Sequence, residues 1–493
     1  MTPARVRFAP SPTGRLHIGS GRSALYNYLL ARQTGGQFIL RLEDTDRQRF
    51  DPSGEREILD GLRWLGLDWD EGFDIGGPHA PYRQSERKDI YQQHAAKLID
   101  LGRAYHCFCS PQRLAALREE QQKNHQPNRY DGLCLRLNAA EVHRRLDAGE
   151  PHVIRIHIPA DGQTVAWDQL RGDIVFENAN LDDAILVRSD GFAVYHLAAI
   201  VDDYLMGITH VFRGSEWLPS FPLHVNIYDA FGWQQPEWYH LSVFLKASGK
   251  GKMSKRDSAE MALDGNSIFV NDLAGLGYLP EAAVNWIALM GWSYDDRTEF
   301  FTLRDLIEKF DPARLNPAPA AINFSKFDHF NGVHIRTLPV KELAGRIQPF
   351  FLQAGIPADL DRLVQIAPLI QERLLTLDEA VSLAGFFFKD DLSPGIDDLI
   401  PKGLDRESAH QVAGRSLKLL ENLPNLDPVE VETTLRNLAE ELGLKPGQVF
   451  GVLRGAITGQ QISPPLMESM AILGREVVLA RLRSAVTRLA ETA

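Results

Sequence analysis

The sequence predicts an α/β protein: a doubly wound parallel sheet that carries an α+β insertion and is followed by an all-α region. Three observations support this fold class. At the N-terminus an apolar strand, a tight loop, a helix and a second strand follow one another, as in a βαβ unit. Short segments of alternating apolar and polar residues fill the middle of the chain. After about residue 335 this alternation ends, and only helical periodicity remains.

The first βαβ unit brings a polar loop to the carboxyl edge of its first strand. Residues 6–9 form the expected first strand, and residues 38–42 form the second. The loop places His17, Gly19 and Ser20 where strand gives way to helix, and a helix N-terminus favours phosphate groups. Neither a P-loop nor a dinucleotide fingerprint fits the spacing. The loop is therefore either a nucleotide-binding loop or a proline-rich turn with an incidental histidine.

A second basic segment lies far downstream, within residues 246–257. It contains Lys252, Ser254 and Lys255 in the run Lys-Met-Ser-Lys-Arg. A basic loop of this kind can close over phosphates and neutralise the charge that develops on a leaving pyrophosphate. Taken alone, the segment favours a solvated lysine-rich turn over a phosphate-binding loop.

Together, the His17 loop and the lysine segment resemble the two ATP-handling motifs of class I aminoacyl-tRNA synthetases. Four further stretches are similar to bacterial glutamyl-tRNA synthetases: residues 7–14, 41–46, 81–87 and 213–218. The similarity runs over essentially the whole chain. Ser20 stands where the general motif has a histidine, but a small residue is common there in this family. The resemblance implies ATP-dependent attachment of L-glutamate to the 3′ end of tRNA-Glu through a glutamyl-adenylate, assisted by Mg²⁺.

The resemblance also implies which residues form the site, with His17, Lys252 and Lys255 acting in catalysis. The residues that would bind ATP are His17, Gly19, Ser20, Lys252, Ser254 and Lys255. The residues that would bind L-glutamate are Arg7, Ala9, Ser11, Glu43, Tyr195 and Arg213. An arginine suits a γ-carboxylate because the pair is charge-assisted and bidentate.

Several of these residues also have plainer interpretations. Glu43 follows a strand and is alternatively a carboxylate at a helix start, and Tyr195 is alternatively a core aromatic residue. Asp202 and Asp203 either position ATP or the RNA end, or cap a helix. Ala199 stands where glutamate-binding relatives often carry asparagine, so one polar contact is either missing or supplied by another group.

Three cysteines, an odd number, argue against a disulfide framework and favour a reducing compartment. Cys107, Cys109 and Cys134 have the softness and spacing for a structural Zn²⁺, but they leave the tetrahedron one ligand short. Some relatives supply a histidine where this chain has Arg136, and others supply a tyrosine, which would here be Tyr130. The two alternatives are a Zn²⁺ site that includes Tyr130 and three reduced cysteines without a metal.

The changes in residue pattern along the chain and the resemblance together divide the chain into five parts. Residues 1–85 and 186–240 are the two halves of a Rossmann-like catalytic domain, and residues 86–185 are an insertion that contacts the tRNA acceptor end. Residues 241–325 form a lysine-loop and stem-contact domain. Residues 326–493 form an anticodon-binding region of two subdomains, or alternatively a generic helical scaffold. The helices expected there span residues 340–352, 361–374, 404–420, 429–443 and 466–489.

The composition of the 493-residue chain is that of an ordinary globular protein, with 44% hydrophobic and 24% charged residues. No run approaches the roughly 18–20 apolar residues of a membrane span, and no signal peptide precedes the first strand. We therefore expect a cytoplasmic monomer without membrane contact. The net charge of −12 is unusual for an RNA-binding protein, so a local basic face would have to serve tRNA. Two rival hypotheses are a small-substrate nucleotidyltransferase and a non-catalytic, RNA-binding relative of the synthetases.

Overall fold

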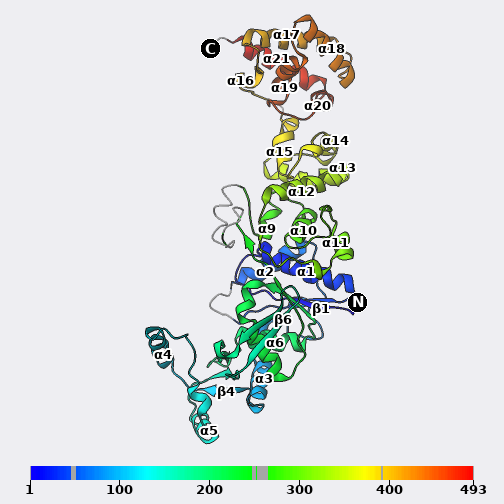
Figure 1. Ribbon diagram of the computed structural model, residues 1–493. Coiled ribbons are helices and arrows are strands. Elements are labelled where there is room, and N and C mark those ends of the chain that lie inside the picture. The colour runs from blue at the N-terminus through cyan, green and yellow to red at the C-terminus, as the bar shows by residue number, and fades with distance from the viewer. Residues whose placement is uncertain (1, 46–50, 247–250, 252–264, 390–391, 492–493) are drawn as a thin grey trace. The chain divides into compact units, whose positions relative to one another are not determined.

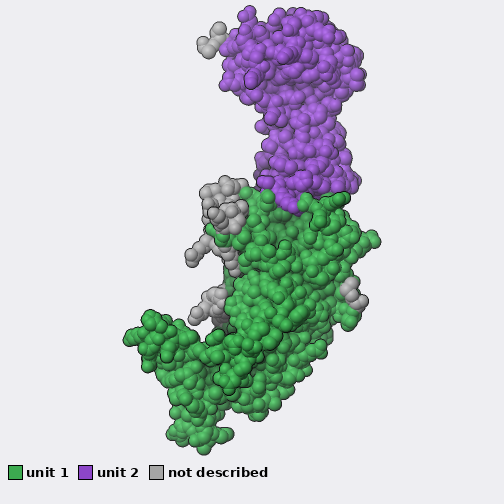
Figure 2. Space-filling model, viewed as in Figure 1, with its two compact units in different colours: residues 1–273, 283–324 green, residues 274–282, 325–493 purple. Residues whose placement is uncertain are grey.

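A computed structural model describes residues 2–45, 51–246, 251, 265–389 and 392–491. The chain forms two compact units, which are residues 1–273 with 283–324 and residues 274–282 with 325–493 (Figure 2). The expected fold class is confirmed, because the first unit contains parallel strands with helices, and the described residues after 324 form helices without strands (Figure 1).

The first unit is built around parallel strands on either side of β1. Before the insertion lie β1 (Arg5–Phe8), α1 (Ile18–Thr34), β2 (Gln37–Leu40), α2 (Pro52–Trp64) and β3 (Glu71–Gly72). After it lie α6 (Tyr195–Leu205), β9 (His210–Gly214), α7 (Phe221–Phe231), β10 (Glu237–Leu241) and β11 (Phe244–Leu245). The strand orders are β1-β2-β3 and β9-β10, all parallel.

The two groups of strands meet at β1. The backbone N–H of Thr209 donates to the carbonyl oxygen of Arg5 at 2.8 Å, so β1 lies between β2 and β9. In a doubly wound sheet, the crevice at such a reversal of strand order holds the ligand. The core beneath it packs apolar side chains of β2, α6, α7 and β10, among them Ile39, Leu197, Val225 and Trp238. This arrangement places the ends of β1, β2 and β9 around one crevice.

The insertion consists of helices and antiparallel strands. It contains α3 (Lys88–Asp100), β4 (Ala104–Cys107), α4 (Pro111–Lys123), α5 (Ala139–Asp147), β5 (Val153–Ile156), β6 (Gln163–Asp168), β7 (Gly172–Glu177) and β8 (Ile185–Val187). One sheet has the order β4-β5-β8, and β6 and β7 form a separate ribbon. Neither α4 nor α5 buries a residue, and both project from the body of the unit (Figure 1).

The remaining elements before residue 324 are α9 (Val270–Leu273), α10 (Pro280–Leu289), α11 (Leu303–Lys309) and β12 (Ala320–Ala321). β11 and β12 pair in parallel, with Phe244 opposite Ala320. The lysine segment lies largely outside the described residues, and this includes Lys252, Ser254 and Lys255.

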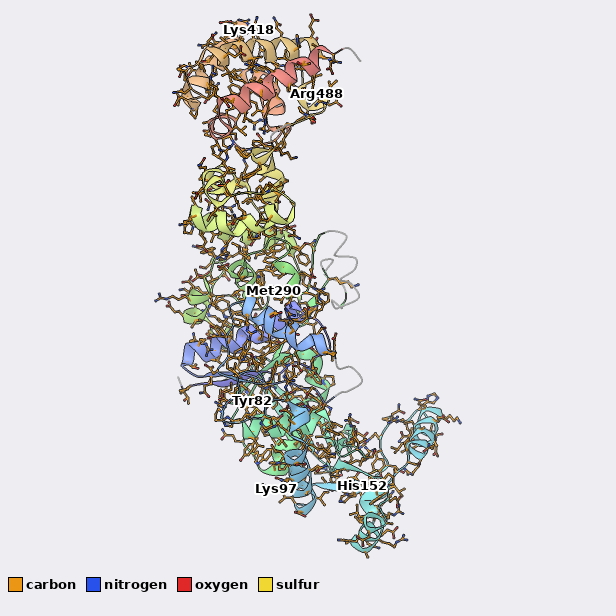
Figure 3. All side chains as sticks on the ribbon, turned by 180° about the vertical axis from the view of Figure 1, so that it is seen from behind. Tyr82, Lys97, His152, Met290, Lys418 and Arg488 are labelled. Carbon is orange, nitrogen blue, oxygen red and sulfur yellow. The ribbon has the colours of Figure 1, made fainter. Side chains whose placement is uncertain are left out.

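The second unit is helical, with Lys418 on α17 and Arg488 on α21 (Figure 3). Its main helices are α12 (Phe324–Thr337), α13 (Val340–Gln353), α14 (Leu360–Ile370), α15 (Glu379–Ala384), α16 (Ile396–Leu399), α17 (Arg406–Asn422), α18 (Pro428–Glu441), α19 (Pro446–Thr458), α20 (Leu466–Leu473) and α21 (Arg475–Ala490). The single helix expected over residues 466–489 is wrong, because Gly474 at φ +85° separates two helices. Among the described helices of the chain, none is long and apolar enough to cross a membrane.

Candidate active site

A cavity of about 500 Å³ opens where β1, β2 and β9 end and α1 and α6 begin. It is lined by every described residue that the resemblance assigned to ATP or glutamate: Arg7, Ala9, Ser11, His17, Gly19, Ser20, Glu43, Tyr195 and Arg213. The first and last of these residues, Arg7 and Arg213, lie more than two hundred positions apart in the chain, and the fold brings them together. Trp217 and Ser242 also line the cavity.

His17 is the N-cap of α1 as well as a lining residue. Its backbone is extended, at φ −85° and ψ 146°, and its ring Nδ1 accepts a hydrogen bond from the N–H of Gly19 at 2.9 Å. Because Nδ1 is the acceptor, the proton of the neutral ring lies on Nε2. The histidine of the loop is therefore not incidental: it closes the first turn of the helix and has a defined tautomer.

The floor of the cavity is a buried network of arginines and carboxylates. Arg7 contacts Asp203 through two nitrogens, at 3.0 and 3.2 Å. Arg41 donates to Asp203 at 2.8 Å and to Glu43 at 3.1 Å. Burial raises the pKa of Glu43 above its usual value in spite of these arginines. Burial also opposes ionisation of Asp203, but Arg7 and Arg41 outweigh it and hold the pKa of Asp203 below its usual value.

The same network shows where Asp202, Asp203 and Glu43 lie relative to the cavity and to the helix ends. Asp202 lies within α6 and is fully buried; it accepts from Arg87 at 2.7 Å and from Tyr91 at 2.8 Å. Asp203 is equally enclosed by arginines, and neither aspartate caps a helix or lines the cavity. Glu43 is not a helix-start residue either, because α2 begins nine residues later with Asp51 as its N-cap.

Arg213 is held in a different way, by histidines. Its Nε donates to Nε2 of His240 at 2.9 Å, and its Nη1 lies 2.6 Å from Nδ1 of His224. Its Nη2 is buried and has no hydrogen-bond partner, and the described residues place no carboxylate in ion-pair contact with it. Burial lowers the pKa of Arg213 below its ordinary value. The face of Trp238 covers the guanidinium at 4.7 Å.

Tyr195 begins α6 beside this arginine. Its ring packs against Trp217 with centroids 4.4 Å apart, and burial raises the pKa of Tyr195 to about 12. The phenol is therefore neutral and can donate a hydrogen bond. Ala199 is buried within α6 and does not line the cavity.

The residues that hold Arg213 were not found from the sequence. His224 lies on α7, His240 on β10, and Asp168, which His240 contacts at 2.7 Å, ends β6. No spacing pattern links residues 168, 224 and 240, because strand pairing and helix packing alone bring them together. Trp217 could have been predicted to line the cavity, since it belongs to the 213–218 stretch that carries the resemblance.

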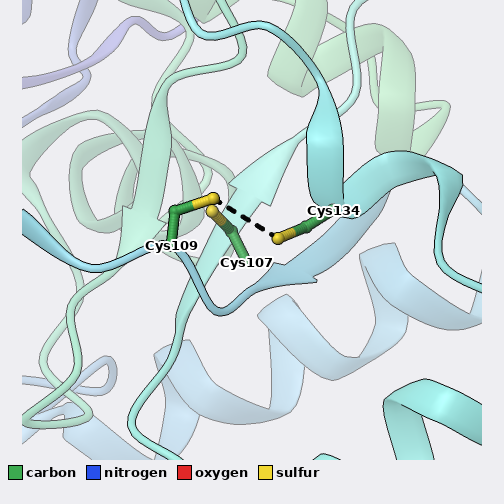
Figure 4. A group of neighbouring side chains, drawn as sticks. All are labelled: Cys107, Cys109 and Cys134. Atoms are coloured by element: carbon green, nitrogen blue, oxygen red, sulfur yellow. Dashed lines mark hydrogen bonds between the residues drawn. The ribbon is translucent and has the colours of Figure 1, made fainter. Parts of the chain in front are cut away.

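The three cysteines of the insertion gather into one cluster (Figure 4). Their sulfurs all lie within 4.8 Å of one another, and those of Cys109 and Cys134 are 3.6 Å apart. The hydroxyl of Tyr130 lies 3.4 Å from the sulfur of Cys109. A tetrahedral Zn²⁺ with Zn–S bonds of about 2.3 Å would separate its sulfurs by about 3.8 Å, so these donors fit the ion. Arg136 points to the backbone of Asp131 instead.

The cluster also has nearby positive charge. Arg113 donates to the sulfur of Cys109 at 3.4 Å, and the guanidinium of Arg155 lies 4.3 Å from the centre of the Tyr130 ring. Burial opposes ionisation of Cys107, but contacts with Tyr130 and Arg155 lower its pKa. Burial raises the pKa of Cys109 to about 11. The surroundings therefore act in opposite directions on the thiols of Cys107 and Cys109.

Comparison with known families agrees with the site. Residues 3–329 match the family described as tRNA synthetases class I (E and Q), catalytic domain, and residues 342–486 match an anticodon binding domain family. A glutamate–tRNA ligase of Dehalococcoides mccartyi is 44% identical over 492 residues, which are 99% of this chain and 98% of the relative. A glutamate–tRNA ligase of Treponema denticola is 40% identical over 508 residues, covering 98% of this chain and 99% of the relative.

Solved structures give the same answer. The crystal structure of a glutamate tRNA ligase from Elizabethkingia meningosepticum, in complex with its amino acid, superposes with a TM-score of 0.91. That protein is 34% identical, and the match covers 99% of this chain and 100% of the other. Matches of this length favour a synthetase over both rival hypotheses.

Proposed function

Because the chain belongs to the class I tRNA synthetases of the glutamate and glutamine family, we propose that the cavity at the end of β1 activates glutamate with ATP. The chain attaches glutamate to tRNA in translation. We further infer that the residues lining the cavity divide between those that bind glutamate and those that bind ATP.

The observation that carries the assignment is the buried guanidinium of Arg213. Its close acceptors are two histidine nitrogens, the phenol of Tyr195 also interacts with it, and its Nη2 has no hydrogen-bond partner. Burying a cation without a counter-charge is costly, and a ligand carboxylate that pairs with it removes this cost. The γ-carboxylate of glutamate supplies that charge, whereas the neutral amide of glutamine does not. We therefore assign Arg213 to the glutamate side chain.

The other lining residues suit the rest of the amino acid. Glu43 is the one cavity carboxylate that the sequence singled out, and the α-ammonium group of glutamate would favour its ionised form. Arg7, Ala9 and Ser11 lie along the end of β1 and the loop after it, and Tyr195 presents a neutral hydroxyl. We assign these residues to glutamate binding.

ATP would lie at the start of α1. Nε2 of His17 carries a proton and can donate to a phosphate oxygen, next to the backbone of Gly19 and Ser20. Lys252, Ser254 and Lys255 are assigned to the phosphates by resemblance alone, since they lie outside the described residues. Mg²⁺ bound with ATP would neutralise charge on the pyrophosphate.

The proposed reaction has two steps and needs no protein nucleophile. An α-carboxylate oxygen of glutamate attacks the α-phosphorus of ATP, the bond to pyrophosphate breaks, and glutamyl-adenylate forms. The 3′-terminal ribose hydroxyl of tRNA-Glu then attacks the acyl carbon, loses its proton, and releases AMP. The protein contributes positioning and charge stabilisation, which suffice for chemistry of this kind.

The resemblance also implies a role for each of the expected parts of the chain outside the catalytic domain. We propose that residues 86–185 contact the tRNA acceptor end, that residues 241–325 contact the stem, and that residues 326–493 read the anticodon. The match of residues 342–486 to an anticodon binding domain supports the last assignment. Three free cysteines fit the reducing cytoplasm in which we place the protein, as a monomer.

We also propose that Cys107, Cys109, Cys134 and Tyr130 hold a structural Zn²⁺, because three sulfurs and a hydroxyl converge there. Protein purified without chelators or nickel should contain about one equivalent of zinc. Tyr130→Phe, which removes only the hydroxyl, should bind zinc more weakly than the unsubstituted protein. Less than about a tenth of an equivalent in the unsubstituted protein would leave three reduced cysteines as the better description.

The experiment that tests the proposed function is glutamate-dependent ATP–pyrophosphate exchange, with and without total tRNA and with glutamine as the competing substrate. We expect exchange with glutamate that requires tRNA, because the resemblance implies coupling of RNA binding to activation. Exchange with glutamate alone would preserve the chemistry but remove that coupling. A folded protein that exchanges with neither amino acid would contradict the assignment of the cavity.

A further inference from the structure

The neutral partners of Arg213 set it apart from a neighbouring buried arginine. Arg41 donates to the carboxylate of Asp203, so its charge is compensated inside the protein. Arg213 instead contacts two imidazoles, those of His224 and His240, both fully buried. The guanidinium is thereby fixed in place by two hydrogen bonds, while no carboxylate among the described residues forms an ion pair with it.

We propose that His224 and His240 are positioning residues that make the pocket select an anionic side chain, because they hold Arg213 through neutral acceptors and leave its charge for the substrate. This inference rests on the proposed binding of glutamate at Arg213. Neither histidine lines the cavity, so both act through the arginine.

The hydrogen bonds around the two histidines fix their tautomers. Asp168 Oδ2 accepts from Nδ1 of His240 at 2.7 Å and from its backbone N–H at 3.0 Å, so Nε2 of His240 has no proton and accepts from Arg213. On the other side, Nδ1 of His224 accepts from Arg213, and its Nε2 faces Nδ1 of His196 at 2.9 Å. A protonated imidazole has no acceptor nitrogen, so these contacts require both rings to be neutral.

The surroundings keep the rings neutral. Burial lowers the pKa of His224 far below its ordinary value, and the nearby guanidinium groups of Arg213 and Arg7 lower it further. Burial takes the pKa of His240 to about 4, although the carboxylate of Asp168 opposes the shift. The other titratable groups that face these rings are His196 on α6 and Arg171 after β6, and neither favours a second positive charge.

A pair of substitutions of nearly equal size separates the hydrogen bond from the charge. In His224→Asn, the amide oxygen can occupy the position of Nδ1 and accept from Arg213 as a neutral group. In His224→Asp, a carboxylate accepts from the same nitrogen and compensates the arginine from inside the protein. His224→Leu removes the acceptor altogether. The three variants therefore differ in whether Arg213 is held and in whether its charge is left for a ligand.

The experiment measures KM for glutamate in tRNA-dependent ATP–pyrophosphate exchange, with ATP and tRNA saturating. We expect His224→Asn to raise KM by less than about tenfold, as for one altered neutral hydrogen bond. His224→Asp should raise it by at least about thirtyfold, with KM for ATP unchanged, and should reduce the preference for glutamate over glutamine. His224→Leu should fall between them. A matched pair, His210→Asn and His210→Asp at the start of the same strand as Arg213, should leave KM for glutamate unchanged.

A second measurement makes the test independent of how the variants fold. In the unsubstituted protein, ¹⁵N spectra of the histidine rings should show His224 and His240 neutral from about pH 6 to about pH 8, with and without glutamate. A protonated ring at either position would overturn the inference. So would equal values of KM for glutamate in folded His224→Asn and His224→Asp. If the unsubstituted protein does not activate glutamate at all, the proposed function itself fails, which is a different result.

Discussion

His17 combines two tasks in one ring, because its Nδ1 closes the first turn of α1 while its Nε2 carries the proton assigned to a phosphate of ATP. The two tasks use opposite sides of the imidazole. A side chain that reproduces only the first side should therefore separate stability from catalysis.

We expect His17→Asn to keep the stability of the first unit and lose adenylate formation. Asparagine is a good N-cap and can accept from the N–H of Gly19, whereas His17→Ala should cost about 1 kcal/mol of stability. Both variants should lower the exchange rate by about 10²–10³-fold, because neither places an N–H donor at the position of the histidine Nε2. Denaturant unfolding and ATP–pyrophosphate exchange measure the two effects. An Asn variant with full exchange activity would restrict His17 to the role of a helix cap.

The described residues that the sequence assigns to the cavity are those that lie in local motifs. Arg7 lies near the end of the first strand, Ser11 and His17 follow it, and Glu43 follows the next strand. Chain order alone therefore predicts that they meet at one edge of the sheet. The histidines around Arg213 could not be predicted in this way. Their partnership depends on the pairing of β9 with β10, in which Arg213 lies opposite His240, and no local pattern reports that register.

At the scale of elements, helices with a clear apolar face were predicted to within a few residues, and α13 and α18 are examples. β6 was missed because its outward residues include Val165 and Trp167, which are exposed, so the strand lacks a polar face. The break between α20 and α21 was missed because helical periodicity continues on both sides of Gly474. At φ +85° and ψ 157° this residue adopts a conformation almost confined to glycine.

The same residue gives a prediction about stability. Gly474→Ala should destabilise the second unit by about 1–3 kcal/mol, because a Cβ is strained at that φ even though no atom lies within 4 Å. Gly447→Ala provides the matched control: it is equally unobstructed but lies inside α19, where alanine is the better helix former. Thermal unfolding should show a lower melting temperature for the first variant and an equal or higher one for the second. Two equal shifts would mean that the chain bends at Gly474 without strain.

At the scale of the whole molecule, the buried histidines make the first unit sensitive to acid. Burial lowers the pKa of His196 to about 4 and that of His240 to about 4, while an unfolded histidine titrates near pH 6.5. Below about pH 6.5 these histidines therefore bind protons in the unfolded chain but not in the folded unit, and the free energy of unfolding falls as the pH falls. The carboxylates with lowered pKa, such as Asp203, act in the same direction at still lower pH.

We expect the urea midpoint of the first unit to be lower at about pH 5 than at about pH 7.5, by an amount worth a few kcal/mol. Tryptophan fluorescence follows this unit, since Trp217, Trp233 and Trp238 all lie in it. His224→Asn should show a smaller difference between the two pH values, because one titrating group is removed. A midpoint that does not change with pH would mean that the imidazoles of His196, His224 and His240 accept protons in the folded state.

The contact between Arg87 and Asp202 determines how this chain can be rebuilt. Arg87 stands directly before α3, Asp202 lies on α6, the first helix after the insertion, and their side chains meet in the core at 2.7 Å. This buried ion pair thus holds the two ends of the segment between Arg87 and Asp202 together in the core. Lengthening a segment between fixed ends costs little entropy, about 0.6 kcal/mol for each doubling. Within this stretch, α4 and α5 bury no residue, whereas Tyr91 holds Asp202 and Asp168 holds His240. The two helices are therefore the part that could be shortened, extended or exchanged while the core and the cavity keep their supports.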